Sequence, residues 1–265
     1  MKIYAVVNQK GGVGKTTSVI NIGAYMAAGG LRVLIVDLDP QANATSGLGI
    51  DKSGVEKSTY DLLLQSAGLE EIVLPANGTS NLFLLPANPA LSGAEVELVN
   101  EMAREFRLQQ ALQAADDRYD YILIDCPPSL SVLTINALTA ARDGVLIPIQ
   151  CEYLALEGLS QLMHTLDMVR RYLNHDLQVR GMLMTMYDSR TNLSRQVVEE
   201  VRSHFPGKVF RTIIPRNVRL SEAPSYGQPI NTYAPTSPGA LAYQLLTSEL
   251  VRGDGVMLPA KEKRP

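Results

Sequence analysis

The chain has 265 residues, of which 46% are hydrophobic and 19% charged, and its formal net charge is −3. These values are typical of a globular protein large enough for one α/β domain, and they give no bulk attraction to nucleic acid. No apolar run reaches the roughly 18 residues that a membrane helix needs, so we expect no membrane partner. The first predicted strand begins at Ile3, which leaves no room for a signal peptide, and we expect a cytoplasmic protein. Cys126 and Cys151 lack metal-type spacing and are predicted to be core residues.

Apolar, β-branched runs alternate with helical patterns along the chain, which predicts β-α units and a parallel sheet. The predicted strands are Ile3–Val7, Arg32–Asp37, Leu82–Leu85, Tyr121–Asp125, Gly144–Ile149, Val179–Met186 and Val209–Ile213. Most of these runs lack apolar–polar alternation, as expected of strands that are covered on both faces. We therefore predict the α/β fold class, with a doubly wound, mostly parallel sheet and helices on both faces.

Helical spacing marks several further segments. Apolar residues recur at this spacing from Leu156 to Leu173, and this stripe faces either the core, which we favour, or a second subunit. The segments Ser194–Phe205 and Gly239–Arg252 are predicted helices. No interdomain linker is visible, so residues 1–252 are expected to form a single domain and residues 253–265 a flexible tail.

A glycine-rich loop lies between the first predicted strand and a helical pattern. Its sequence is Asn8-Gln9-Lys10-Gly11-Gly12-Val13-Gly14-Lys15-Thr16-Thr17. Strand, glycine loop and helix is the context that a phosphate-binding loop requires, because glycine lets the backbone approach phosphate oxygens and the helix N-terminus adds its dipole. In such a loop Lys15 reaches the β- and γ-phosphates and the Thr16 hydroxyl ligates Mg²⁺. The alternative is a glycine turn with incidental lysines.

The loop departs from the common G-x-x-x-x-G-K-[ST] motif, because Gln9 stands where the first glycine is expected and Lys10 is an additional lysine. This form resembles the deviant Walker A loop of the ParA/MinD family of P-loop ATPases. The resemblance implies ATP and Mg²⁺ as cofactors, bound by the loop from Lys10 to Thr17. It also implies that Lys10 reaches across a dimer interface to the phosphates of the partner's nucleotide, so that Lys10 and Lys15 both serve catalysis.

The second predicted strand closes on the run Val36-Asp37-Leu38-Asp39-Pro40. Carboxylates at this edge of a parallel sheet, beside a phosphate loop, lie where ligands bind in doubly wound folds. The resemblance implies that Asp39 orients the attacking water and that Asp37 organises Mg²⁺ and its waters. Alternatively, either aspartate caps a turn before Pro40, and the sequence leaves this open.

The strand Tyr121–Asp125 consists of four largely apolar residues followed by an aspartate. This pattern describes a Walker B strand, in which Asp125 holds Mg²⁺ through water. Many strands end in aspartate, so the pattern gains its weight from the phosphate loop and Asp39. No glutamate is placed as a strong general base, and we therefore expect slow, Mg²⁺-dependent ATP hydrolysis that depends on positioning and charge neutralisation.

The run Ile213-Ile214-Pro215-Arg216-Asn217 follows the last predicted strand. In the family, a segment of this form wraps the adenine, and Pro215 and Asn217 match the positions that contact the base. From the residues alone, Asn217 can equally serve as a turn residue.

Residues 180–219 contain eight arginine or lysine residues against three acidic ones, a net charge of +5, which leaves −8 for the rest of the chain. Such asymmetry indicates an anionic partner for one face, although a solvated helix face with scattered arginines is the alternative. The segment Met186–Leu193 resembles one that carries a DNA-contacting arginine in chromosomal ParA proteins, and Arg190 and Arg219 match the best-placed residues. Neither lies in a helix-turn-helix pattern, so we expect phosphate contacts without base reading.

The resemblance covers the chain from Lys2 to about Leu250, and the runs Asp37–Gly49, Cys151–Leu159 and Pro215–Ser225 are close to the chromosomal ParA proteins called Soj. It implies a chromosome-partitioning ATPase, cytoplasmic and associated with the nucleoid. ATP would close a homodimer that binds double-stranded DNA non-specifically. A ParB-type (Spo0J-like) centromere-binding protein would then stimulate hydrolysis and release the dimer from DNA.

Two other classes share the loop. A MinD-like membrane-cycling ATPase carries a C-terminal amphipathic helix, whereas the tail here has two glycines and a proline between Gly253 and Pro259. A small-molecule enzyme of the synthetase or metal-delivery kind needs a substrate pocket or cysteine ligands, and the sequence shows a signature for neither.

Overall fold

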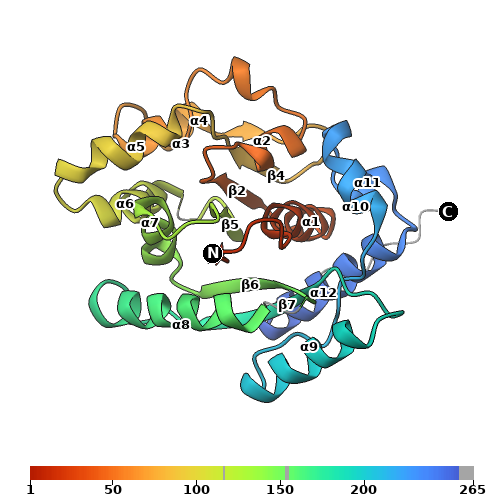
Figure 1. The fold of residues 1–265 in the computed structure, drawn as a ribbon. Coiled ribbons are helices and arrows are strands. Elements are labelled where there is room, and N and C mark those ends of the chain that lie inside the picture. Colours follow the sequence, from red (N-terminus) through yellow and green to blue (C-terminus); the bar gives the residue numbers. More distant parts are fainter. Residues whose placement is uncertain (116, 153–154, 257–265) are drawn as a thin grey trace.

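The computed structural model describes residues 1–115, 117–152 and 155–256, and within these residues seven strands form one sheet (Figure 1). Its order is β3-β4-β2-β5-β1-β6-β7, and every neighbouring pair is parallel except β3 with β4. The strands are β1 (Lys2–Val6), β2 (Val33–Asp37), β3 (Leu74–Pro75), β4 (Leu82–Leu85), β5 (Tyr121–Asp125), β6 (Gly144–Gln150) and β7 (Val179–Thr185). The doubly wound, mostly parallel sheet predicted from the sequence is confirmed.

Helices cover both faces of the sheet (Figure 1). One face is covered by α3 (Thr59–Leu63), α4 (Leu69–Ile72), α5 (Leu91–Glu97), α6 (Arg107–Leu112), α7 (Val132–Ala140), α8 (Ala155–Tyr172) and α9 (Asn192–His204). The other face is covered by α1 (Lys15–Ala28), α2 (Asn43–Gly47), α10 (Val218–Glu222), α11 (Ile230–Tyr233) and α12 (Pro238–Gly253). Short 3₁₀ helices are η1 (Lys52–Gly54), η2 (Leu98–Asn100), η3 (Arg104–Phe106), η4 (Gln113–Ala115) and η5 (Ala223–Tyr226).

Burial on both faces explains why the strands lack alternation. In β2, Leu34 and Val36 pack into one core, and Val33 and Ile35 pack into the other. Successive side chains of a strand point to opposite faces, so each face of β2 requires apolar residues. The apolar stripe of α8 also faces the core, because Leu159, Leu162, Leu166 and Val169 are buried there; the Leu156 side chain lies outside the described residues.

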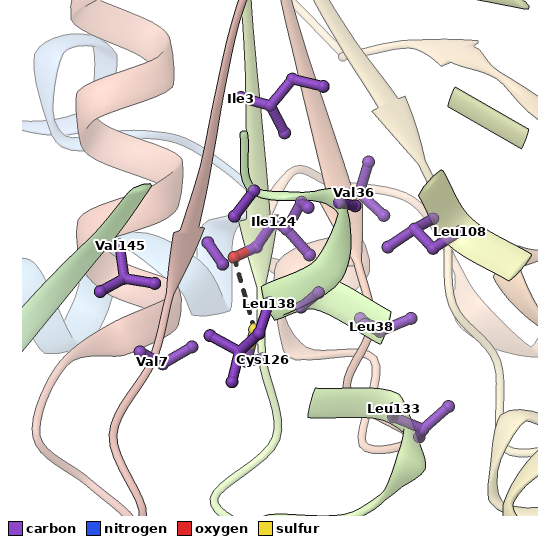
Figure 2. Close-up of a cluster of buried hydrophobic side chains, with 14 of the residues drawn as sticks. Ile3, Val7, Val36, Leu38, Leu108, Ile124, Cys126, Leu133, Leu138 and Val145 are labelled. Carbon is purple, nitrogen blue, oxygen red and sulfur yellow. Dashed lines mark hydrogen bonds between the residues drawn. The ribbon is translucent and has the colours of Figure 1, made fainter. Parts of the chain in front are cut away.

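Cys126 is a core residue, as predicted. Its side chain points into the cluster drawn in Figure 2, where it lies near Val7 and Leu138, and its Sγ lies 3.8 Å from the Ile124 carbonyl oxygen. Burial raises the pKa of the Cys126 thiol well above its ordinary value, so the group is neutral. Cys151 is likewise buried.

The predicted strand Val209–Ile213 is wrong. Only single bridges form here, between Val209 and Met182 and between Pro215 and Tyr187. The amide N–H groups of Arg211 and Thr212 instead donate to the Glu249 carboxylate of α12, at 2.7 and 3.0 Å, so these residues leave the ladder. The other six predicted strands are confirmed with each end within one residue, and the two-residue edge strand β3 was not predicted.

The end of α12 is anchored beneath the sheet. The Asp254 carboxylate, with only 3% of its side chain exposed, accepts hydrogen bonds from the Tyr4 and Tyr121 hydroxyls at 2.8 and 2.9 Å and from Arg180 Nε at 2.8 Å. Of the predicted flexible tail, Gly253 therefore still belongs to α12, and Asp254 is fixed on three side chains from β1, β5 and β7. Its last nine residues, 257–265, lie outside the described residues.

We expect Asp254→Ala to lower the free energy of unfolding by about 2–4 kcal/mol, because it leaves a half-buried guanidinium and two tyrosine hydroxyls without their acceptor. Urea denaturation measures this change. The control Asp167→Asn removes an exposed carboxylate that pairs with Arg170 and should cost less than about 0.5 kcal/mol. Equal costs for the two variants would contradict the anchoring role.

Candidate functional site

The strand register brings acidic residues together at the carboxyl edge of the sheet. Asp125, the last residue of β5, pairs in register with Asp37 on one side and with Val6 on the other. The loop that follows β1 therefore leaves the sheet directly beside two buried carboxylates. Ligands bind at this edge in doubly wound folds.

The loop after β1 has the backbone shape of a phosphate cradle. Gly12 and Gly14 have φ angles of +74° and +91°, a region that strains any other residue. A Cβ added at Gly11 or Gly12 meets no atom within 4 Å, so both glycines border open space. The residues from Gly14 to Thr17 then begin α1, whose N-terminal amides point toward that space.

Side chains from neighbouring strands fix this loop. The Asn8 side chain accepts a hydrogen bond from the Lys10 amide at 3.0 Å and donates one to the Pro148 carbonyl at 2.7 Å. The Thr185 hydroxyl donates to the carbonyl of Val13 at 2.8 Å. Contacts with β6 and β7 thus help to hold the loop in shape.

The two lysines of the loop differ in direction and burial. Lys15 is 7% exposed, lines the cavity at the loop, and donates to the Lys10 carbonyl at 3.2 Å. Burial lowers the pKa of Lys15, while Asp125, Cys126 and Asp39 act in the opposite direction. Lys10 instead has 36% of its side chain exposed, and its Nζ lies 3.6 Å from a carboxylate oxygen of Glu152.

Asp125 has the surroundings expected of a cation ligand. It is fully buried, and neither carboxylate oxygen has a hydrogen-bond partner in the described part of the chain. Burial and the charges of Asp37 and Asp39 raise its pKa well above the ordinary value, and the nearby Thr16 and Lys15 offset part of this rise. Such a group is costly unless a ligand compensates it.

Asp37 is fully engaged within the chain. One oxygen accepts from the Asp39 amide at 3.2 Å, and the other from the Thr45 amide and hydroxyl at 2.8 and 2.7 Å. Burial raises the pKa of Asp37 to about 6, against these hydrogen bonds. The structure therefore gives Asp37 the task of fixing α2, and its role toward Mg²⁺ stays a prediction.

Asp39 lines the cavity at the loop, although it is only 6% exposed. Its Oδ1 accepts a hydrogen bond from the Gln41 amide at 2.9 Å. The turn-capping contact and the cavity position thus coexist, because the other carboxylate oxygen is not used by this turn. Asp39 remains the predicted residue for orienting water.

Two cavities of about 420 Å³ each meet at the start of α1. The phosphate-side cavity is lined by Gly11, Gly12, Gly14, Lys15, Thr16, Thr17, Asp39, Gln41, Asn43, Pro128 and Met186. The second cavity is lined mainly by Thr185 and the segment from Ile214 to Ser221, including Pro215 and Asn217. Gly14, Thr17 and Met186 border both, so the two cavities are neighbours, and the second has the more apolar lining.

The predicted base-contact residues line the second cavity. Asn217 has a buried Oδ1 without a hydrogen-bond partner in the described residues, and its side chain does not cap the helix that follows. An unpaired amide oxygen beside an apolar cavity can accept a hydrogen bond from an exocyclic amino group. Pro215 lines the same cavity.

The two predicted DNA-contacting arginines are exposed but already paired. Arg190 donates to both oxygens of Asp188 at 2.9 and 2.7 Å, and this guanidinium holds the pKa of Asp188 well below its usual range. Arg219 pairs with Glu222 at 2.8 Å. Their side chains are 84% and 58% exposed.

Sequence reasoning assigned no role to Thr45, Thr185, Met186 or Glu152. Thr185 had a signal, since it is a polar residue that closes an apolar strand. Met186 adopts a φ of +52°, and no residue pattern indicates such a backbone angle for methionine. Thr45 and Glu152 act through contacts that only the folded chain brings together.

Among the helices that the structure describes, none has the length and hydropathy to cross a bilayer. In the same residues, no three histidine, cysteine or acidic side chains gather as a metal cluster. A metal-delivery function therefore gains no support from the described residues.

Comparison with known proteins gives consistent matches along the whole chain. A family model described as an AAA domain (AAA_31) matches residues 1–179. The sporulation initiation inhibitor protein Soj of Bacillus subtilis is 57% identical over 94% of this chain and 98% of its own. The chromosome partitioning protein ParA of Myxococcus xanthus is 53% identical over 98% of this chain and 91% of its own.

Solved structures agree on the fold. A crystal structure named cobyrinic acid a,c-diamide synthase from Mycobacterium smegmatis, with bound ADP and magnesium, has a TM-score of 0.85 and 39% identity over 99% of both chains. The MinD cell-division ATPase of Pyrococcus furiosus has a TM-score of 0.75 at 24% identity, over 95% of this chain and 98% of its own, which shows a shared fold. The chain therefore belongs to the ParA/MinD-type ATPase family, among the Soj and ParA chromosome-partitioning proteins.

Proposed function

We propose that this protein is a chromosome-partitioning ATPase that closes into a homodimer on ATP and Mg²⁺ and binds double-stranded DNA of the nucleoid non-specifically. A ParB-type centromere-binding protein then stimulates hydrolysis and releases it. Relatives named as chromosome-partitioning proteins or ATPases, at 52% to 54% identity, support the biological role. The steps of the cycle are argued below from the site.

The residues present fit Mg²⁺ and ATP. The open space beside Gly11 and Gly12 accommodates phosphate oxygens, and of the two neighbouring cavities the second has the more apolar lining that suits a base. The unpaired carboxylate of Asp125 and the Thr16 hydroxyl supply the oxygen ligands that Mg²⁺ prefers. When bound, Mg²⁺ neutralises charge that develops on the phosphate oxygens.

Hydrolysis then needs the chain to position groups around the γ-phosphate. Lys15 and the loop amides hold the phosphates, and Asp39 orients the attacking water from the cavity wall. No glutamate or histidine lines the phosphate-side cavity in the described residues, so general-base catalysis is weak and turnover by the isolated protein is slow.

The position of the Lys10 side chain is the observation that supports the proposed dimer. Lys10 belongs to the phosphate loop, yet its side chain lines neither cavity of its own subunit in the described structure and is 36% exposed, with its Nζ beside Glu152. A lysine of the phosphate loop whose side chain lies outside its own nucleotide cavities is suited to reach a second subunit. Two such subunits, face to face, would each lend Lys10 to the other's phosphates.

We propose that DNA binds to the exposed arginines Arg190 and Arg219, whose surface we call the arginine-bearing face. Each of the two arginines lies a few residues after a segment that lines the second cavity. Arg190 follows Thr185 and Met186, and Arg219 follows Pro215 and Asn217. A dimer doubles the number of arginines that contact phosphates at once, and affinity rises with each neutralised phosphate. DNA binding is therefore strongest for the ATP-bound dimer.

One neighbour supports a second candidate, an ATP-dependent small-molecule synthase. The structure named for a diamide synthase is 39% identical over nearly the whole chain, below the 57% of the Soj relative. The two functions separate in one experiment, in which ATP turnover is measured with duplex DNA and a ParB-type protein or with cobyrinic acid. Stimulation by cobyrinic acid alone would replace our proposal.

We expect Asp39→Ala to bind Mg²⁺–ATP but to hydrolyse it at least about tenfold more slowly, because the attacking water loses its orienting carboxylate. The variant should accumulate as a DNA-bound dimer, visible by co-sedimentation with duplex DNA. The control Lys15→Ala should bind neither ATP nor DNA. Normal turnover by Asp39→Ala would remove Asp39 from the mechanism.

Lys10→Ala should retain ADP binding by the single subunit, since the Lys10 side chain lies outside its own cavities. It should lose the ATP-dependent dimer, because the partner's phosphates lose a positive charge. Calorimetry with ADP and size-exclusion chromatography with a non-hydrolysable ATP analogue measure the two effects. A Lys10→Ala protein that dimerises as the unaltered chain does would refute the bridging role.

Arg219→Ala should weaken DNA binding equally for all duplex sequences and reduce the slope of log K against log salt by about 1 per lost contact. Fluorescence anisotropy at several salt concentrations measures both quantities. Arg171→Ala, on α8 and outside the positively charged segment, is the control with the same loss of charge. If both variants changed the slope equally, Arg219 would have no special place in the DNA contact.

A further inference from the structure

Glu152 joins two basic side chains that belong to different parts of the nucleotide site. Its Oε2 lies 3.6 Å from Lys10 Nζ, and its Oε1 lies 3.4 Å from a guanidinium nitrogen of Arg216. Lys10 is in the phosphate loop, and Arg216 stands between the predicted base-contact residues Pro215 and Asn217. One carboxylate therefore connects both ends of the nucleotide site.

The carboxylate is held in place by its own strand end. Glu152 follows β6, and its Oε1 accepts a hydrogen bond from Gln150 Nε2 at 2.6 Å. Its amide donates to the Gln150 carbonyl at 2.8 Å, and the neighbouring Cys151 amide donates to the Thr185 carbonyl of β7 at 3.0 Å. Glu152 thus extends from a rigid sheet edge, whereas Lys10 has four rotatable side-chain bonds, so the lysine is the partner that moves.

We propose that Glu152 is a latch that holds Lys10 inside its own subunit and sets how much ATP is needed for the dimer. This inference rests on the proposed function, because it assumes that Lys10 acts on the phosphates of a second subunit. Lys10 cannot pair with Glu152 and reach another subunit at the same time. The dimer therefore forms only when contacts with the partner's triphosphate outweigh the pair within the subunit.

The balance of energies suits a switch of this kind. The two groups are 36% and 44% exposed, and an ion pair between such groups contributes at most a factor of about five to an equilibrium. A contact with a triphosphate carries more charge and is stronger. The latch is thus weak enough for ATP to open, yet two latches per dimer shift the dimer equilibrium by up to about 25-fold.

The same carboxylate gives the base end of the site a means to affect Lys10. Arg216 lines the cavity beside Pro215 and Asn217, and its guanidinium also contacts the Glu152 carboxylate. A weaker Arg216–Glu152 pair leaves Glu152 more negative toward Lys10, and a stronger pair leaves it less so. A base that changed the Arg216–Glu152 pair would therefore also change how strongly Glu152 holds Lys10.

The test compares the unaltered chain with Glu152→Gln, which keeps the shape of the side chain and removes its charge. Sedimentation velocity with Mg²⁺ and a non-hydrolysable ATP analogue, without DNA, gives the dimer dissociation constant. We expect Glu152→Gln to dimerise about 5- to 25-fold more tightly. The control Glu70→Gln removes one exposed carboxylate that pairs with Arg118 and lines neither cavity, and it should leave the constant unchanged.

A second readout uses the nucleotide-free protein and does not depend on dimer formation. Lysine acylation with a small reagent, followed by peptide mass spectrometry, reports how freely the Lys10 amine reacts. We expect Lys10 to react faster in Glu152→Gln than in the unaltered chain, whereas Lys2 and Lys57 react equally in both.

The outcomes separate the latch from the function on which it rests. If the unaltered chain forms no dimer with the ATP analogue, the proposed function itself fails. If the unaltered chain dimerises but Glu152→Gln dimerises equally or more weakly, or if Lys10 reactivity does not rise, Glu152 is not a latch. A weaker dimer would instead make Glu152 a support for Lys10 in the closed state.

Discussion

The site depends on the register between β2, β5 and β1. This pairing places the carboxylates of Asp37 and Asp125 side by side at the carboxyl edge of the sheet, with the phosphate loop leaving β1 next to them. Burial raises the pKa of both carboxylates, and the charge of Asp37 raises that of Asp125 further, so burying the pair opposes the folded state. The chain offsets one with Thr45 and the Asp39 amide and leaves the other, Asp125, unpaired for a cation.

Burying the Asp125 carboxyl group without a hydrogen-bond partner lowers the stability of the unliganded fold and leaves the group available to a cation. A buried carboxyl group without a hydrogen-bond partner is tolerated because the surrounding sheet is buried on both faces and over-determines its position. In the proposed function, Mg²⁺ bound with a nucleotide would compensate Asp125, and a ligand that binds only the folded chain also stabilises the fold. In the proposed cycle this binding energy brings two subunits together.

The sequence predicted the sheet and the order of strand, glycine loop and helix well, because both depend on local signals. Uninterrupted apolar runs such as Tyr121–Asp125 identify strands buried on both faces, and the Gly11–Thr16 pattern allows few backbone shapes. The strand predicted at Val209–Ile213 failed because the Glu249 carboxylate, far along the chain, takes the amide hydrogens that a ladder needs. The roles of Thr45 and Glu152 were missed for the same reason, since their partners are set by tertiary packing alone.

The two lysines of the phosphate loop differ in their surroundings. Lys15 is buried against its own cavity, and Lys10 is exposed and paired with Glu152. The central claim is that nucleotide, not DNA, decides when the arginine-bearing face can act. It is tested most directly by titrating duplex DNA into the unaltered protein with Mg²⁺ and either a non-hydrolysable ATP analogue or ADP. The account predicts salt-sensitive binding that is at least tenfold tighter with the ATP analogue, and equal affinity in the two states would contradict it.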